Sequence, residues 1–197
     1  MKRMFAALLA LAAVCTVAPR LAHAQDGSAM KAEMVSSMMD AGGKIQELAG
    51  AMPDKKYDWR PGKGVRSARE VYLHVVAGNY MLASMAGAKA PMSMADLQGL
   101  EKTTPDKAKI EQMLKDSYKF ASDAINNTPD SEMETQVDFF GTKMSKRALL
   151  MVLVSHSHEH LGQSIAYARM NGVTPPWTAR QEAAAKKAAE SKKTTGM

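Results

Sequence analysis

The sequence predicts an all-α protein, a four-helix bundle in a single domain. Apolar residues recur at three- and four-residue steps, the spacing of one face of an α-helix, in four stretches: residues 28–51, 67–86, 104–127 and 145–170. A strand signal is lacking outside the region around Phe139. Four amphipathic helices without a sheet bury their apolar faces against one another, which gives a bundle around one core.

The first predicted helix, residues 28–51, carries a stripe of methionines. Met30, Met34 and Met38 follow one another at four-residue steps, and Gly42-Gly43 weakens the middle of the helix. Thioether ligands suit copper(I), but methionine is far more often a flexible filler of a hydrophobic core. We therefore interpret this stripe as core.

The second predicted helix begins at a capping signal. Ser67 and Glu70 have the spacing of a capping box, in which each side chain bonds the other residue's backbone N–H. Before it, residues 53–64 are rich in Pro, Gly and charge and are expected to form a loop, with Trp59 plugging the end of the bundle. After it, residues 87–104 hold two Gly and one Pro, and at most one short helical turn is expected there.

The third and fourth predicted helices are separated by an irregular connection. Thr104-Pro105 places Pro at a first helical position. Residues 128–143 form the connection, with a turn at Phe139-Phe140-Gly141. The fourth helix is apolar on every side over residues 148–154, so it is expected to be central in the bundle, and Asn171-Gly172 is a typical helix stop.

Residues 1–24 have the three parts of a secretory signal peptide. A basic start precedes an apolar run over residues 5–17, and Ala22-His23-Ala24 is a small-x-small cleavage site before Gln25. The run is too short to span a bilayer. We expect export to the periplasm or the medium without stable membrane insertion. Cys15, the single cysteine, is removed with the signal, which excludes disulfides and thiolate sites.

Charge and composition divide the remaining chain into a domain, residues 25–177, and a tail, residues 178–197. The domain has 18 basic and 18 acidic side chains, and the excess of positive charge lies in the signal and the tail. A nucleic-acid-binding domain concentrates basic charge on the fold, so this function is excluded. The Ala/Lys-rich tail lacks an apolar stripe and is expected to be a frayed helix or disordered. A homodimer is left open.

Three histidines have the spacing of a metal site. On a helix, His156 and His160 lie one turn apart on the same face, whereas His158 points away from them. Buried imidazoles need partners, and His74 is the remaining histidine that a second helix offers. Three neutral imidazoles bind a divalent ion and leave a position open for water or substrate.

These residues resemble the DinB/YfiT-like family over about residues 30–172. The shared pattern consists of Trp59-Arg60-Pro61, Ser67, His74, His156-x-x-x-His160-Leu-Gly-Gln163 and Tyr167. The resemblance implies a four-helix bundle with long crossover connections and a metal triad of His74, His156 and His160. It also implies a metal-dependent reaction, since some members activate a small thiol. An exported protein meets little reduced thiol, so this chain departs from that reaction.

The function predicted from the sequence is metal-dependent hydrolysis or group transfer on a small molecule. The alternative is a metal- or ligand-binding stress-response module without turnover. Zinc or nickel is favoured, and iron and manganese are left open because imidazole suits several ions. Glu70 is a candidate to orient His74, and Gln163 to bond a metal-bound water. His156-x-x-Glu159-His160 also matches an inverted zinc-peptidase motif, a minor alternative in which Glu159 is the general base.

Overall fold

The computed structural model describes the backbone of residues 2–195 and the side chains of residues 27–192. Its helices are α1 (Lys2–Ala51), α2 (Ala68–Met85), α3 (Met94–Gly99), α4 (Lys107–Asn127), α5 (Lys146–Met170) and α6 (Pro176–Thr195). Short 3-10 helices η1 (Asp54–Lys56), η2 (Leu100–Lys102) and η3 (Asp130–Glu132) lie in the connections. The strands β1 (Gln136–Phe139) and β2 (Thr142–Ser145) form one antiparallel hairpin.

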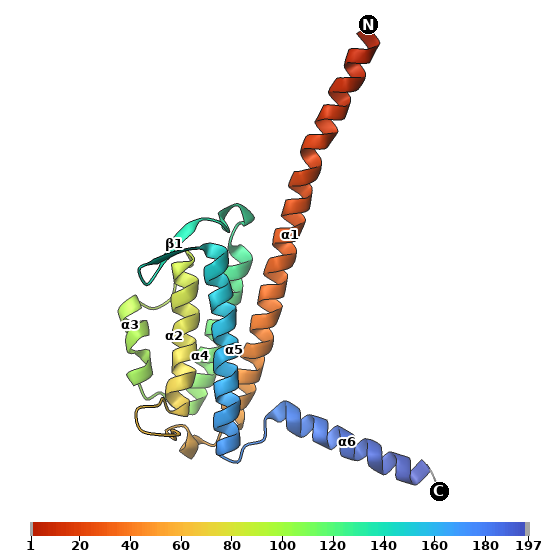
Figure 1. Ribbon diagram of the computed structural model, residues 1–197. Helices are drawn as coiled ribbons and strands as arrows, with labels where there is room; N and C mark the ends of the chain where they lie inside the picture. The colour runs from red at the N-terminus through yellow and green to blue at the C-terminus, as the bar shows by residue number, and fades with distance from the viewer. Residues whose placement is uncertain (1, 196–197) are drawn as a thin grey trace.

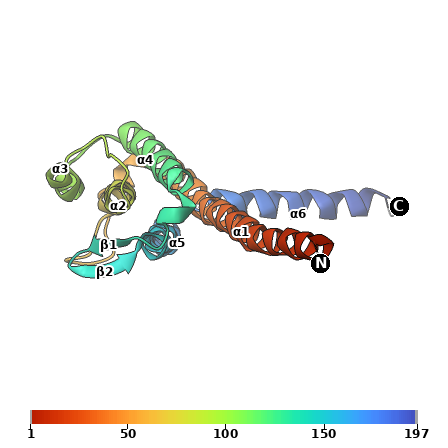
Figure 2. The ribbon, with the colours of Figure 1, turned by 90° about the horizontal axis from the view of Figure 1, so that it is seen from above.

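Four helices form the bundle, which confirms the predicted class. α1 packs against α4 and α5, and α2 packs against the same two helices, so α1 and α2 occupy opposite corners (Figures 1 and 2). α2 and α4 run in the same direction, because the connection that carries α3 returns along α2 (Figure 1). The crossover connections that the resemblance implied are therefore present.

The core lies between the four helices and includes the methionine stripe of α1. Met34 is 4% exposed and Met38 is fully buried, which confirms their interpretation as core residues. α1 is continuous through the Gly42-Gly43 pair. A Cβ added at Gly42 would lie 2.6 Å from the ring of Tyr118 on α4, so the missing side chain lets the two helices approach closely.

The connections contain more regular structure than the sequence predicts. α3 and η2 occupy residues 94–102, where at most one helical turn was expected. The fourth bundle helix α5 begins at the cap Ser145, as predicted. The cap of α4 is Asp106, whose carboxylate accepts from Lys109 N, so Pro105 precedes the cap and is not the first helical residue that the sequence predicted. The connection expected to be irregular holds the β1–β2 hairpin, with Phe140 and Gly141 as its two-residue loop.

Both ends of the chain are helical where the structure describes them. α1 extends back to Lys2, through the predicted signal peptide. An alanine- and leucine-rich run favours helix wherever it lies, and the side chains of residues 1–26 fall outside those described, so the signal remains a prediction. The tail from Thr178 lies in α6, which projects from the bundle (Figure 1). None of the described helices has the length and apolar character needed to cross a bilayer.

Candidate metal centre

Three imidazole rings converge between α2 and α5. Nε2 of His74 lies 3.2 Å from Nε2 of His156, and the ring centroids of the three pairs among His74, His156 and His160 are 4.4 to 5.1 Å apart. One ligand nitrogen from each ring lies within 4.8 Å of the others. The structure thus brings together the three histidines that the sequence singles out.

A carboxylate outside the cluster holds the ring of His74. Nδ1 of His74 lies 2.6 Å from Oε1 of Glu101, whose other oxygen accepts from Nε of Arg66 at 2.6 Å. Although partial burial opposes ionisation, the hydrogen bonds from Arg66 and His74 lower the pKa of the Glu101 carboxyl. An ionised carboxylate only accepts. Nδ1 of His74 therefore carries the proton, and the lone pair on Nε2 faces the other two rings.

A chain of three hydrogen bonds holds His160 in the same way. The hydroxyl of Tyr167 donates to the carbonyl of Arg66 at 3.0 Å and accepts from Nε2 of Gln163 at 3.2 Å. This fixes the orientation of the Gln163 amide, whose Oε1 accepts from Nδ1 of His160 at 2.8 Å. Metal-binding histidines usually donate their outer nitrogen to such an acceptor. The inner nitrogen of His160 is then an unprotonated Nε2.

The third ring, His156, is held by packing. A Cβ added at Gly78 of α2 would lie 2.4 Å from Cε1 of His156, so the ring occupies the space that a side chain at this position would fill. Its Nδ1 is buried and lacks a hydrogen-bond partner among the described residues. Burial lowers the pKa of His156 to about 3, and the rings of His160 and His74 act in the same direction. Burial also lowers the pKa of His160, against the opposing effect of Gln163.

The remaining residues singled out from the sequence lie around this centre. Glu70 completes the capping box with Ser67 and pairs with Arg60 at 3.3 Å, so the carboxylate that contacts His74 is Glu101 instead. Gln163 contacts the ring of His160, whereas the sequence suggested a contact with bound water.

Three further candidates lie outside the centre. His158 is exposed and its Nε2 lies 3.0 Å from Oγ of Ser37, and Glu159 is exposed. Trp59 packs edge-on against Tyr167, with ring centroids 5.3 Å apart. The tryptophan thus covers the outer end of the hydrogen-bond chain that leads to His160.

Glu101 and Arg66 were missed by reasoning from the sequence. Glu101 lies in η2, in the connection expected to be largely irregular, 27 positions from His74. His74 and Glu101 are not related by a helical spacing. They meet because η2 packs along α2. A lone carboxylate in a connection is too common a feature to have signalled this role.

A cavity of about 360 Å³ opens beside the three histidines. We call it the apolar recess, and its apolar wall includes Ala77, Met81, Leu97, Phe139, Phe140 and Val152. His74 and His156 line its inner side, and Gln98 and Glu101 add polar groups. Ligand sites are commonly mostly apolar cavities of this size with a few polar groups.

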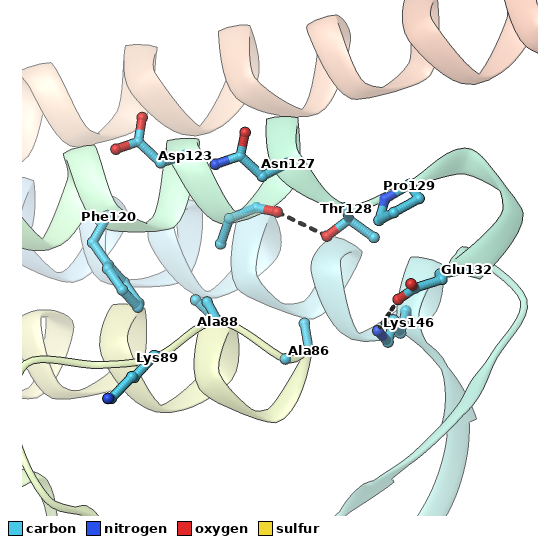
Figure 3. Close-up of a pocket in the computed structure, with 13 residues that line it drawn as sticks. Ala86, Ala88, Lys89, Phe120, Asp123, Asn127, Thr128, Pro129, Glu132 and Lys146 are labelled. Atoms are coloured by element: carbon cyan, nitrogen blue, oxygen red, sulfur yellow. Dashed lines mark hydrogen bonds and ion pairs between the residues drawn. The ribbon is translucent and has the colours of Figure 1, made fainter.

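A second cavity, of about 330 Å³, lies between the ends of α2 and α4 (Figure 3). Three of its polar side chains are engaged with one another or with backbone. Lys146 pairs with Glu132 at 2.6 Å, and the hydroxyl of Thr128 donates to the carbonyl of Ala124 at 2.8 Å (Figure 3). None of the three clustered histidines lines this cavity. Of the two cavities, the apolar recess is therefore the one that adjoins the candidate metal centre.

The packing of His156 over Gly78 predicts opposite effects for two glycine substitutions. Gly78→Ala places a methyl group against the ring, and overpacking should lower the free energy of unfolding by about 1–3 kcal/mol. Gly162→Ala on α5 is the matched control, because a Cβ there meets nothing within 4 Å and should stabilise the helix by about 0.5–1 kcal/mol. Urea unfolding of the metal-free proteins measures both, and equal stabilisation would contradict the close contact.

Comparisons with known proteins agree with this architecture. A solved DinB-like protein from Bacillus cereus has a TM-score of 0.63 at 21% identity, covering 73% of this chain and 93% of its own. YfiT from Bacillus subtilis, described as a probable metal-dependent hydrolase with an unusual four-helix bundle topology, has a TM-score of 0.59 at 16% identity, covering 73% and 89%. Identities this low show the fold alone.

The sequence comparisons extend beyond the fold. The uncharacterized protein YjoA from Bacillus subtilis is 24% identical over 155 residues, covering 72% of this chain and 91% of that protein. The model of the DinB family matches residues 24–193, a wider range than the motifs indicated. The chain belongs to the DinB family.

Proposed function

We propose that this protein is a metal-dependent hydrolase of a small molecule, with one divalent ion held by His74, His156 and His160. The observation that carries the proposal is the convergence of three imidazole rings, two of which, His74 and His156, line a cavity. Three rings at this separation are costly to bury without a shared partner. A cation supplies that partner, and the adjoining recess supplies room for a substrate.

The donor set fits a divalent ion of borderline softness. Neutral imidazole suits zinc and nickel, which we favour, as well as iron. His74 and His160 present unprotonated Nε2 atoms, because Glu101 and Gln163 hold the protons on their outer nitrogens. Low pKa values keep His156 and His160 neutral at physiological pH. His156 and His160 are thus available as ligands without first losing a proton to solvent.

The open side of the site favours catalysis over a purely structural role. Structural zinc sites are usually closed by four protein ligands, whereas catalytic sites have three and an open position. An ion in such a site polarises a carbonyl and lowers the pKa of bound water. The protein's own part is to hold the rings through Glu101, Gln163 and Gly78, and to keep bulk water away with the apolar wall of the recess.

The similarity to YfiT supports the reaction class. That protein is described as a probable metal-dependent hydrolase, and it shares the fold of this chain. Hydrolysis needs water as its only co-reactant, which is present in every compartment. Hydrolysis is therefore compatible with an exported protein. Transfer of a small thiol is not, because an exported protein meets little reduced thiol.

A pair of histidine substitutions on α5 tests the proposal. The full chain and its His158→Ala variant should each retain one zinc ion after equilibrium dialysis, since His158 lies on the exposed face. His160→Ala should weaken zinc binding by at least about 100-fold, because it removes a ligand rather than an outer partner. Zinc content is measured by atomic emission, and hydrolysis of 4-nitrophenyl acetate is followed with the same samples.

The outcomes separate three readings of the site. Zinc-dependent hydrolysis by wild type and His158→Ala, lost in His160→Ala, supports the proposal. Zinc binding without hydrolysis of this or related esters and amides supports a non-catalytic binding module. Equal zinc retention by all three proteins, with unchanged helical circular dichroism, excludes the three-histidine site.

We also propose that the protein is exported and that its signal is cleaved before Gln25. The support is the apolar run of residues 5–17 followed by Ala22-His23-Ala24. Protein expressed from the full sequence in a Gram-negative host should appear in the periplasmic fraction with Gln25 as its first residue. Mass spectrometry of that fraction tests this, and an intact chain confined to the cytoplasm would refute it.

A further inference from the structure

The tip of the β1–β2 hairpin holds a phenylalanine in an unfavourable backbone conformation. Phe140 and Gly141 form the two-residue loop, with φ values of 51° and 85°. A loop with positive φ at both positions favours Asn-Gly, because asparagine tolerates the left-handed region. For a bulky side chain this conformation is a genuine outlier. Such outliers are concentrated at functional sites, where the surroundings impose them.

The turn itself does not need the side chain of Phe140. The carboxylate of Asp138 accepts from the backbone N–H of Gly141 at 3.0 Å, and β1 and β2 pair on both sides of the loop. The ring of Phe140 is 65% exposed, and it contacts Phe139 edge-on with centroids 4.9 Å apart. The chain thus keeps a large apolar side chain both poorly buried and poorly accommodated.

Both aromatic rings of the hairpin line the apolar recess, opposite the helices that carry the histidines. The recess is therefore lined by His74 and His156 of the histidine cluster and by Phe139 and Phe140 of the hairpin. Its volume of about 360 Å³ has room for roughly a dozen non-hydrogen atoms, at about 30 Å³ for each water-sized group.

The charge of the recess limits what can occupy it. Glu101 is the one ionisable side chain that lines it besides the histidines, among the residues that the structure describes. Its carboxylate is already engaged by Arg66 at 2.6 Å and by His74 at 2.6 Å. A charged group that entered the recess would lose its hydration without gaining a partner, which is unfavourable. An uncharged apolar group would lose nothing of that kind.

From these observations we propose that the substrate joins a polar, metal-binding head to an uncharged apolar group of about six carbon atoms. The head faces His74, His156 and His160, and the apolar group fills the recess under Phe140, which determines specificity for it. This inference rests on the proposed metal site. It adds the chemical class of the substrate and a residue, Phe140, that selects it.

The test uses hydroxamates, whose head group binds divalent ions and whose tail length can be varied. Zinc-loaded protein is titrated by calorimetry with acetohydroxamate, butanohydroxamate and hexanohydroxamate. Each buried methylene should tighten binding about three- to fourfold, which gives roughly 100-fold between the two-carbon and six-carbon ligands. Adipic monohydroxamate, which has a six-carbon chain ending in a carboxylate, should bind no tighter than acetohydroxamate.

Substitution of Phe140 separates a role in binding from a role in folding. Phe140→Asn creates the favoured Asn-Gly loop, and should raise the midpoint of thermal unfolding by about 2–4 °C. The same variant should weaken hexanohydroxamate about tenfold while leaving acetohydroxamate unchanged. Met170→Asn is the matched control, since Met170 is 62% exposed and lies outside the recess. It should leave both affinities unchanged.

The failures of the two proposals are distinguishable. Zinc content is measured first, and a protein that retains no zinc overturns both the metal site and this inference. A zinc-loaded protein that binds all four hydroxamates equally, or whose Phe140→Asn variant keeps the full gain from the six-carbon tail, overturns the inference alone. A change of oligomeric state in Phe140→Asn, seen by sedimentation with affinities unaltered, would assign Phe140 to a protein interface and also overturn it.

Discussion

The arrangement of the candidate site depends on Arg66, which anchors both halves of a hydrogen-bond circuit around the histidines. Its guanidinium holds Glu101, and its backbone carbonyl accepts from Tyr167, so His74 and His160 are both oriented from one residue. Arg66 precedes the cap of α2. A residue at the junction of a loop and a helix thus helps to determine which nitrogen carries the proton in two rings on different helices. The result is two unprotonated nitrogens directed at a common point.

Close packing of α2 against α5 supplies what hydrogen bonds do not. His156 has no polar partner for its outer nitrogen among the described residues, and Gly78 gives its ring a place against the neighbouring helix. The crossover topology brings η2 back along α2 and so delivers Glu101 to His74. The same return places Leu97 of α3 in the wall of the recess. The connection that carries α3 and η2 therefore contributes both to the crossover topology and to the candidate site.

Much of the fold and of the candidate site can be predicted from the sequence, and the parts that cannot depend on contacts between distant segments. Periodicity located the bundle helices, and the four-residue spacing placed His156 and His160 on one face, because both depend on local geometry. The role of Glu101 depends on a contact between distant parts of the chain, which no local pattern encodes. The turn at Phe139-Phe140-Gly141 was predicted, but the strands on either side of it were not. Each strand has four residues, and β2 has Met144 as its one apolar residue, so β2 lacks the alternation of apolar and polar residues that indicates a strand.

The most direct test of the account is the X-ray absorption fine structure of the zinc-loaded protein at the zinc edge. Three imidazole nitrogens at about 2.0–2.1 Å, with one further light-atom ligand, are expected from an open site built by three histidines. The outer-shell scattering of three rings should fall to that of two in His160→Ala and stay at three in His158→Ala. A wild-type spectrum with fewer than three imidazoles would contradict the central claim.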